Sequence, residues 1–222
     1  MQYIQLLHKG RCPYNLKEVK QYSEKQKRWL SSKYDYTVRN NMYELSIYSK
    51  QKQMQENRLG DEEEQALAEG QIRIEFRAFR SKIRYEKNVW EMEDDEKMLS
   101  NASMIAYYEI RKLLFLMYGI GDFVKKDEVL RKIENASFHP ETKESMIHFC
   151  ELSNRKYGMD LAYKSYSNRT SNGARMKMRF DKIGISPICI PRNSNFNRMK
   201  SPLFYIHYNT VNEREYKKYI LL

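Results

Sequence analysis

Two stretches of the chain alternate strictly between apolar and polar side chains, and this period of two is the feature that most restricts the possible folds. Between residues 42 and 48, the apolar and polar sets are Tyr43, Leu45 and Ile47 against Glu44, Ser46 and Tyr48. Between residues 72 and 77, they are Ile72, Ile74 and Phe76 against Arg73, Glu75 and Arg77. Because successive side chains of a strand point to opposite faces, each stretch is predicted to be a strand with one apolar face. If the two strands pair as antiparallel neighbours, Tyr48 and Glu75 share the polar face.

Helical spacing dominates the rest of the chain. From residue 100 onward a broad apolar stripe predicts a long helix that ends at Gly119 and Gly121. Shorter helices are predicted around residues 126–134, 141–154, 159–166 and 174–183, followed by an extended segment at 185–191. A surface helix is expected over residues 15–31, on the spacing of Leu16, Val19, Tyr22, Trp29 and Leu30.

These elements predict an α+β fold in two parts. Residues 1–120 would form a partial antiparallel sheet with helices on its apolar face. Residues 121–222 would form a basic helical module, a pattern compatible with a helix-turn-helix or winged-helix domain. With 222 residues and 41% hydrophobic content, the chain is long enough for one core or two small ones.

The positive charge is concentrated at the end of the chain. Residues 155–222 hold fourteen Lys and Arg against four Asp and Glu, which is +10 of the total net charge of +11. Clustered cations interleaved with tyrosines suit a nucleic-acid backbone and exposed bases. A lysine-rich surface that serves only solubility is the alternative. The DNA-contact candidates are Lys164, Arg169, Arg175, Lys177, Arg179, Lys182 and Arg192.

Three other classes of protein are disfavoured. The longest apolar stretch, near residues 113–117, is far shorter than the roughly 20 residues of a membrane span. The N-terminus does not have the pattern of a signal peptide. Cys12, Cys150 and Cys189 are odd in number and widely spaced, which argues against a disulfide framework and a zinc site. We therefore expect a protein of the reducing cytoplasm.

The predicted polar face carries side chains that could cut DNA. A tyrosine hydroxyl can attack a phosphodiester and hold the DNA end covalently. A free phenol has a pKa near 10, so it needs a divalent metal and cations that stabilise the developing charge. Tyr48 is the nucleophile candidate, Glu75 the ligand for Mg²⁺ or Mn²⁺, and the accessory cations are Lys50, Arg73 and Arg77. On periodicity alone, these side chains would more often simply face water.

The two strand motifs resemble those of a known family. Ile47-Tyr-Ser-Lys50 and Arg73-Ile-Glu-Phe-Arg77 are similar to the paired "I-Y-x-K" and "R-x-E-x-R" strands of phage and plasmid rolling-circle replication initiators of the gene II/X type, and also to the Rep-trans plasmid initiators. Ile120-Gly-Asp-Phe123 and the segment 180–191 resemble the helical region and closing motif of the phage proteins. The resemblance spans roughly residues 1–195.

The resemblance implies an enzyme that nicks and rejoins one strand at a replication origin. On this basis Tyr48 would hold the 5′ phosphate, Glu75 would bind the metal, and Lys50 would be an accessory cation. The expected partners are DNA, as an origin duplex, hairpin or single strand, and host replication proteins or a second copy of the chain.

The chain also departs from the family pattern. Family members usually carry a His-hydrophobe-His metal pair, whereas His8, His139, His148 and His207 are isolated, and none is assigned to a metal. The chain begins where the family's catalytic sheet would be half built. A shortened initiator that binds DNA without cutting it is therefore one alternative, and a structural protein whose charge serves solubility is another.

Overall fold

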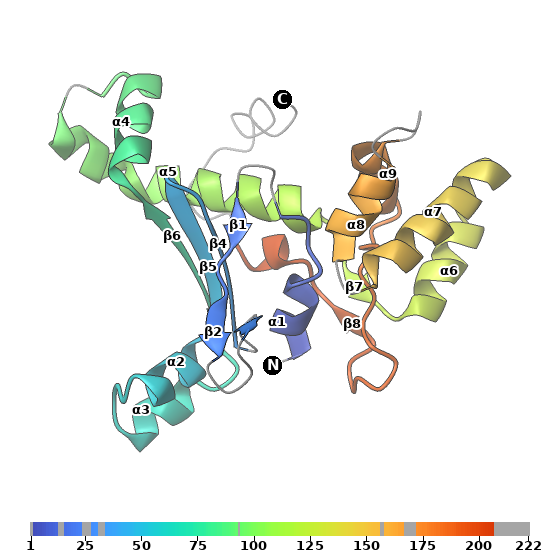
Figure 1. Ribbon diagram of the computed structural model, residues 1–222, viewed down its shortest axis with the longest axis horizontal. Coiled ribbons are helices and arrows are strands. Elements are labelled where there is room, and N and C mark those ends of the chain that lie inside the picture. The colour runs from blue at the N-terminus through green and yellow to red at the C-terminus, as the bar shows by residue number, and fades with distance from the viewer. Residues whose placement is uncertain are drawn as a thin grey trace. The chain divides into compact units, whose positions relative to one another are not determined.

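The computed structural model describes residues 2–12, 16–23, 28–30, 34–92, 94–155, 158–166 and 172–206. These residues form a mixed α and β fold that divides into two compact units (Figure 1). Unit 1 comprises Met1–His8 and Cys12–Ile110, and unit 2 comprises Lys9–Arg11 and Arg111–Leu222. The division falls within one long helix, and the domain boundary expected at residue 120 stays a prediction.

A four-stranded antiparallel sheet, in the order β1-β4-β5-β6, is the main β element of unit 1. Its strands are β1 (Lys17–Glu18), β4 (Asp35–Arg39), β5 (Tyr43–Ser49) and β6 (Ile72–Ala78). The two strands predicted from alternation are confirmed as β5 and β6, and they pair directly with Ser46 opposite Glu75. The sheet therefore has the predicted polar and apolar faces.

Helices cover the apolar face of this sheet. They are α1 (Gln2–Leu7), α4 (Arg80–Val89) and the first part of α5 (Asp95–Tyr118). The ring of His8, just after α1, packs edge-on against Tyr36 of β4. Lys82 of α4 lies over the ring of Tyr43 in β5 and pairs with Glu109 of α5. Val38, Leu45 and Ile47 are fully buried between these elements.

Two helices form the connection between β5 and β6. Ser49 caps α2 (Lys50–Glu56), and Asp61 forms a capping box with Glu64 at the start of α3 (Glu62–Leu67). Neither α2 nor α3 is among the helices predicted from the sequence. The Asp-x-x-Glu spacing is the signal that could have indicated α3.

The surface helix predicted over residues 15–31 is wrong. The described residues in this range form β1 and a two-stranded ribbon of β2 (Gln21–Ser23) and β3 (Arg28–Leu30). The ribbon's register places Tyr22 opposite Trp29. Two apolar residues seven positions apart can lie on one side of a helix, two turns apart, or opposite each other in a hairpin. The spacing therefore does not distinguish a helix from a hairpin.

Unit 2 is a helical bundle with one short ribbon. Its helices are α6 (Lys126–Glu134), α7 (Pro140–Ser153), α8 (Gly158–Ser165) and α9 (Gly173–Lys182), all close to the predicted positions. β7 (Phe123–Val124) pairs with β8 (Arg198–Met199), and a 3-10 helix follows at Pro202–Tyr205. The predicted extended segment at 185–191 forms isolated bridges from Ile185 to Asp122 and from Ile190 to Lys125. The four helices share one buried core that includes Ile133, Phe149, Ala162 and Phe180.

No helix among the described residues is long and apolar enough to cross a membrane.

Helix α4 was not predicted from the sequence, because the side chains that it buries are charged rather than apolar. Its buried residues are Lys82 and Glu86, whereas Ile83 and Val89 are exposed. The Lys82 ammonium pairs with Glu86 and with Glu109 of α5. Burial alone would lower the pKa of Lys82, but the hydrogen bonds and charges of the two carboxylates outweigh it and raise that pKa. This ion cluster fastens α4 to α5.

Replacing Lys82 with Met should therefore destabilise unit 1. The variant leaves two buried carboxylates without their cation, and breaking a buried ion cluster in this way costs about 3–5 kcal/mol. Urea denaturation monitored by circular dichroism measures the loss. Lys87→Met on the same helix is the matched control, because Lys87 pairs with the exposed Asp95 and should contribute less than about 1 kcal/mol. Equal effects of both substitutions would contradict the structural role of Lys82.

Candidate active site on the sheet

The polar face of the sheet presents a grid of side chains set by strand register. One row across the strands contains Asp35, Tyr48 and Arg73, and the next contains Thr37, Ser46 and Glu75. Facing side chains in neighbouring strands lie about 4.5–5.5 Å apart at Cβ. Tyr48 and Glu75 are therefore diagonal neighbours on one face.

Tyr48 and Glu75 are joined by a short hydrogen bond. The Tyr48 hydroxyl donates to Glu75 Oε1 over 2.7 Å. Arg73 Nε contacts the same oxygen at 2.9 Å. The Glu75 and Arg73 side chains are about half exposed (40% and 52%), whereas Tyr48 is buried except for 9% of its surface. The group thus consists of a sheltered phenol beside a solvent-accessible carboxylate and guanidinium.

This environment favours the neutral phenol. Burial raises the pKa of Tyr48 most, the hydrogen bond to Glu75 and the carboxylate charge raise it further, and the charge of Arg73 opposes them; the resulting pKa is about 12. At neutral pH the Tyr48 hydroxyl therefore keeps its proton. Glu75 is correctly placed to receive that proton if additional positive charge stabilises the phenolate.

The other predicted residues of the sheet lie at different distances from this pair. Arg77 is on the same face and contacts Glu44 Oε1 at 3.5 Å, with 69% of its side chain exposed. Lys50 begins α2, and its ammonium donates to Gln53 of the same helix at 3.0 Å. Strand β4, which contributes Asp35 and Thr37 to this face, was not predicted from the sequence. Its own alternation, Asp-Tyr-Thr-Val-Arg over residues 35–39, was the available signal.

The donors on this face fit Mg²⁺ or Mn²⁺ better than zinc. Glu75, Tyr48, Ser46 and Thr37 offer oxygen atoms, and Thr37 and Ser46 are already joined by a 3.1 Å hydrogen bond. Mg²⁺ is commonly held by one or two carboxylates together with substrate phosphates and water, so Glu75 could serve with a DNA phosphate. No group of three or more His, Cys, Asp or Glu that could hold a metal occurs in the described ranges.

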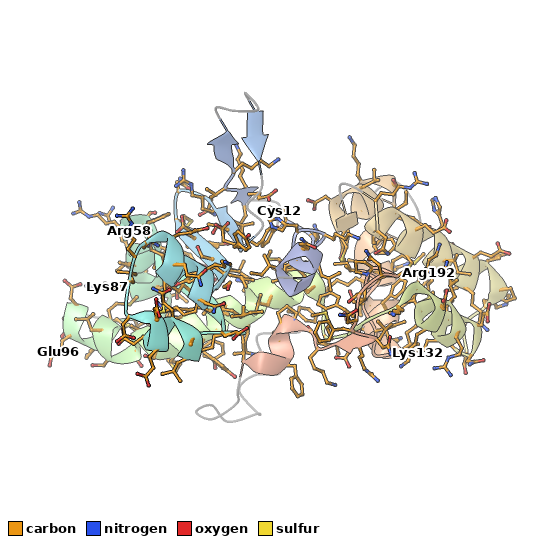
Figure 2. The ribbon with its side chains drawn as sticks, turned by 90° about the horizontal axis from the view of Figure 1, so that it is seen from below. Cys12, Arg58, Lys87, Glu96, Lys132 and Arg192 are labelled. Atoms are coloured by element: carbon orange, nitrogen blue, oxygen red, sulfur yellow. The ribbon has the colours of Figure 1, made fainter. Side chains whose placement is uncertain are left out.

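The basic residues predicted in the second half of the chain differ in exposure. Lys164, Arg175, Lys182 and Arg192 are exposed, Arg179 is half-buried, and Arg169 lies outside the described residues. Arg192 is labelled among the side chains in Figure 2. Lys177 is buried, with its ammonium 3.8 Å from the centre of the Phe115 ring and 3.3 Å from Asp181 Oδ2. Burial is the main cause of a lowered Lys177 pKa. Lys177 therefore serves packing rather than an open phosphate-binding surface.

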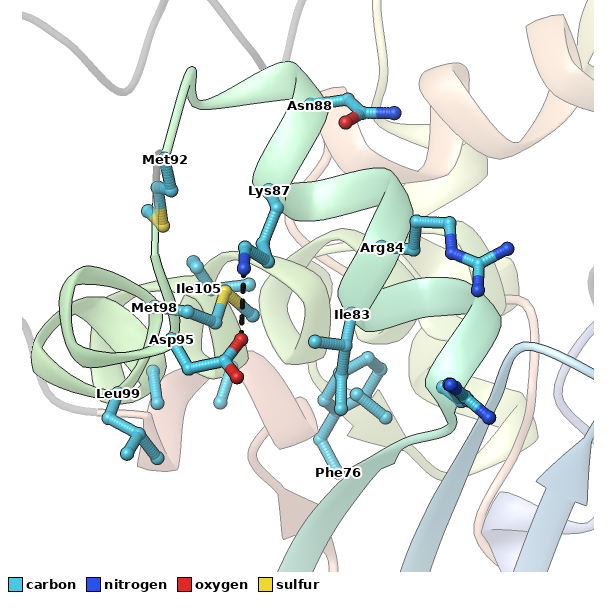
Figure 3. A pocket seen from close by; sticks show the side chains of 14 residues that line it. Phe76, Ile83, Arg84, Lys87, Asn88, Met92, Asp95, Met98, Leu99 and Ile105 are labelled. Carbon is cyan, nitrogen blue, oxygen red and sulfur yellow. Dashed lines mark hydrogen bonds and ion pairs between the residues drawn. The ribbon is translucent and has the colours of Figure 1, made fainter.

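A separate apolar cavity of about 950 Å³ lies between α4, α5 and β6 in unit 1 (Figure 3). Ile83 points from α4 toward α5, where Met98 and Leu99 line the opposite side, whereas Arg84 points away from α5. Lys87 at its edge is paired with Asp95. Among the described residues, the one carboxylate of the lining, Asp95, is this partner of Lys87, so the chemistry-bearing group of unit 1 is on the other face of β6.

Comparison with protein-family models, curated proteins and solved structures returned no match to this chain.

The Tyr48 environment can be tested by titration. We expect the Tyr48 phenol of the folded protein to ionise with a pKa of about 12, measured as the difference in absorbance at 295 nm between the parent and Tyr48→Phe. Glu75→Gln removes the carboxylate charge that disfavours phenolate and should lower the pKa of Tyr48. The folded protein favours the neutral phenol, whereas the unfolded chain ionises it near pH 10. The contribution of Tyr48 to the free energy of unfolding is therefore complete below about pH 10 and is lost as the pH rises through about 12. A difference spectrum that titrates near pH 10 in the parent would contradict the described environment.

Proposed function

We propose that the protein nicks and rejoins a DNA strand through Tyr48, as a rolling-circle replication initiator does. The observation that carries the proposal is the Tyr48–Glu75 hydrogen bond of 2.7 Å, with Arg73 on the same carboxylate oxygen. In this contact a phenol, a carboxylate and a guanidinium lie together on a partly exposed sheet face, where they would act as nucleophile, proton acceptor and cation. Such an activity on an intracellular replicon implies a cytoplasmic protein.

The chemistry follows from these positions. The Tyr48 oxygen attacks the phosphorus as its proton passes to Glu75, and the bond from phosphorus to the 3′ oxygen breaks. The products are a 5′ phosphotyrosine and a 3′ hydroxyl, which takes up a proton. Because the phosphodiester energy is kept in the phosphotyrosine bond, the 3′ hydroxyl can reverse the reaction and release Tyr48.

Because the pKa of Tyr48 is raised, its hydroxyl needs nearby positive charge in order to lose its proton and attack. Arg73 and Arg77 flank Glu75 on β6 and lie on the same face, where they can neutralise the attacked phosphate. Glu75 would hold a divalent ion through Oε2, because Tyr48 and Arg73 contact Oε1, and the ion would polarise the phosphate when bound. Lys50 contributes only if its ammonium leaves Gln53, and we therefore give it a lesser role.

Unit 2 is the proposed DNA-docking part. Arg175 and Lys182 lie on exposed positions of α9, and Lys164 and Arg192 are exposed nearby in the sequence. Lys and Arg side chains at such positions can contact phosphates without sequence preference. The helical order of unit 2 with its β7·β8 ribbon is compatible with a winged-helix or helix-turn-helix module. Host replication proteins or a second copy of the chain are further proposed partners.

A non-catalytic DNA-binding protein is the second candidate. The raised Tyr48 pKa favours it, because a protonated phenol is a poor nucleophile. The isolated histidines of the sequence favour it as well. Both candidates predict DNA binding, and they differ in whether a covalent product forms.

Incubation with labelled single-stranded DNA of the cognate origin and Mn²⁺ or Mg²⁺ tests the nickase. On a denaturing gel, the parent should give a covalent protein–DNA band that disappears in Tyr48→Phe. Glu75→Ala should weaken the metal-dependent reaction, and removing the metal with a chelator should abolish it.

Tyr85→Phe is the matched control, because Tyr85 is an exposed tyrosine of α4. It should leave the covalent band unchanged. A band that persists in Tyr48→Phe would exclude Tyr48 as nucleophile. DNA binding without any band in the parent would make the protein a binder.

Charge reversal on α9 tests the docking surface. Arg175→Glu together with Lys182→Glu should weaken DNA binding and reduce the slope of log K against log salt concentration by roughly 1.5, because each lost phosphate contact is worth about 0.7–0.9. Fluorescence anisotropy over a salt series measures both. Lys112→Glu, a reversal at an exposed position of α5, is the control and should change the slope little. An unchanged slope in the α9 variant would exclude this helix as the docking surface.

A further inference from the structure

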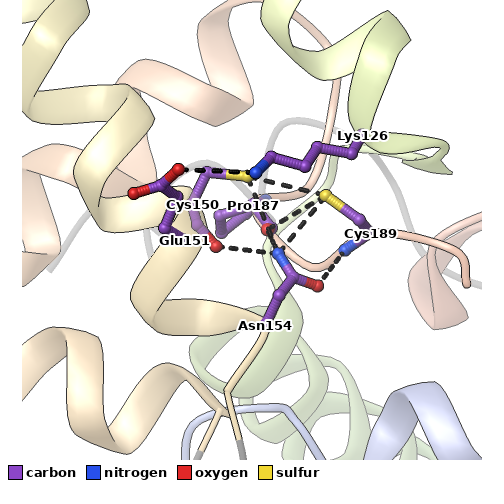
Figure 4. Close-up of polar contacts among 6 residues, drawn as sticks. All are labelled: Lys126, Cys150, Glu151, Asn154, Pro187 and Cys189. Atoms are coloured by element: carbon purple, nitrogen blue, oxygen red, sulfur yellow. Dashed lines mark hydrogen bonds and ion pairs between the residues drawn. The ribbon is translucent and has the colours of Figure 1, made fainter.

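Two cysteines meet in the core of unit 2. Cys150 lies in α7, and Cys189 lies in the extended segment just before Ile190 (Figure 4). Their sulfur atoms are 3.5 Å apart, and both side chains are buried, with 0% and 6% of their surfaces exposed. They are separated by 39 positions in the sequence, so this contact is made by the fold and not by local spacing.

Asn154 fixes the position of both thiols. Its side-chain oxygen accepts a hydrogen bond from the Cys189 backbone N–H at 2.7 Å. Its amide nitrogen donates to the carbonyl oxygens of Cys150 and Pro187 at 2.7 and 2.8 Å, and lies 3.3 Å from Cys189 Sγ and 3.6 Å from Cys150 Sγ. One side chain thereby ties the end of α7 to the segment that carries Cys189.

The two thiols differ in acidity. The hydrogen bond from Cys150 lowers the pKa of Cys189 most; burial opposes this, and the amide of Asn154 and the charges of Lys9 and Lys126 lower the pKa further. The pKa of Cys150 is raised, chiefly by the hydrogen bond to Cys189 and by burial. Because the Asn154 amide lies nearer to Cys189 Sγ (3.3 Å) than to Cys150 Sγ (3.6 Å), Cys189 is the thiol of the pair whose ionisation is favoured.

We propose that Cys150 and Cys189 form a reversible disulfide when the protein meets a peroxide. The Cys189 thiolate attacks one peroxide oxygen, releases water after protonation and becomes a sulfenic acid. The Cys150 sulfur then attacks the Cys189 sulfur, and the second oxygen leaves as water. Overall, the two thiols lose two protons and two electrons, and one hydrogen peroxide takes them up and is reduced to two waters. The sulfur atoms must approach from 3.5 Å to about 2.05 Å, while Asn154 keeps the two backbones in place.

The disulfide would close a loop that contains α8 and α9. Cross-linking a long loop restricts the unfolded chain and so stabilises the folded one. Oxidation should therefore stabilise unit 2 against unfolding. This inference is independent of the proposed nickase.

Mass spectrometry of the full chain tests the pair. The reduced protein is treated with hydrogen peroxide, denatured and alkylated with N-ethylmaleimide. We expect the oxidised protein to lose two hydrogens and to take up one alkyl group instead of three, and peptide mapping to identify a Cys150–Cys189 link. The melting temperature should rise by roughly 5 °C or more and should return on reduction.

Three variants sharpen the test. Cys12→Ser should preserve the link, because Cys12 belongs to unit 1 and its thiol donates to the Leu16 carbonyl. Cys150→Ala should remove it. Asn154→Asp keeps the acceptor for the Cys189 N–H but replaces the donor with a negative charge, and it should slow oxidation several-fold. Alkylation of all three thiols after peroxide treatment of the parent, or a mapped link that includes Cys12, would overturn the proposal whether or not the variants fold.

Discussion

The pairing register of β5 with β6 is the constraint on which both the core of unit 1 and its candidate site depend. Ser46 lies opposite Glu75 and Tyr48 opposite Arg73, so the polar side chains share one face while Leu45 and Ile47 are buried on the other. A slip of one residue would turn every side chain of a strand over. The burial of Leu45 and Ile47 therefore also fixes the 2.7 Å contact between Tyr48 and Glu75. Hydrophobic packing on one side of the sheet thus positions the chemistry on the other.

That contact has opposite effects on reactivity. Glu75 supplies a proton acceptor for the phenol, yet its charge and hydrogen bond favour the neutral hydroxyl and contribute to a Tyr48 pKa of about 12. Arg73, whose Nε lies 2.9 Å from Glu75 Oε1, acts in the other direction, because its charge lowers the pKa of Tyr48. A phosphate alone would add negative charge, so the nickase requires a cation to arrive with the DNA. A divalent ion on Glu75 would meet this requirement, whereas a protein that only binds DNA has no need of it.

Sequence patterns predicted the elements whose burial follows hydrophobicity and failed where it does not. The alternation around Tyr48 and Glu75 predicted β5 and the edge strand β6, and the apolar stripes predicted α5 to α9. Helix α4 was missed because its buried residues, Lys82 and Glu86, are charged. Buried charges of this kind need a partner on another helix, here Glu109, and such a partner cannot be seen in the local sequence. The proximity of Cys150 and Cys189 could not be predicted either, because it depends on the packing of the extended segment against α7. The predicted DNA-contact set relied on charge alone, which does not distinguish an exposed Lys182 from a buried Lys177.

The Lys and Arg side chains of unit 2 have different physical roles. The net charge of this part of the chain therefore overstates the positive charge that faces solvent. Lys177 stacks on Phe115 and pairs with Asp181, whose other oxygen accepts the backbone N–H of Ile120. Arg198 and Lys200 both pair with Asp122, whose pKa burial alone would raise but their hydrogen bonds lower. These cations hold α9 and the β7·β8 ribbon to the segment that follows α5, at Gly119, where a positive φ of 74° ends the helix. Any recognition of phosphate by unit 2 must therefore come mainly from cations at exposed positions, such as Lys182 and Arg192, rather than from the net charge of the segment as a whole.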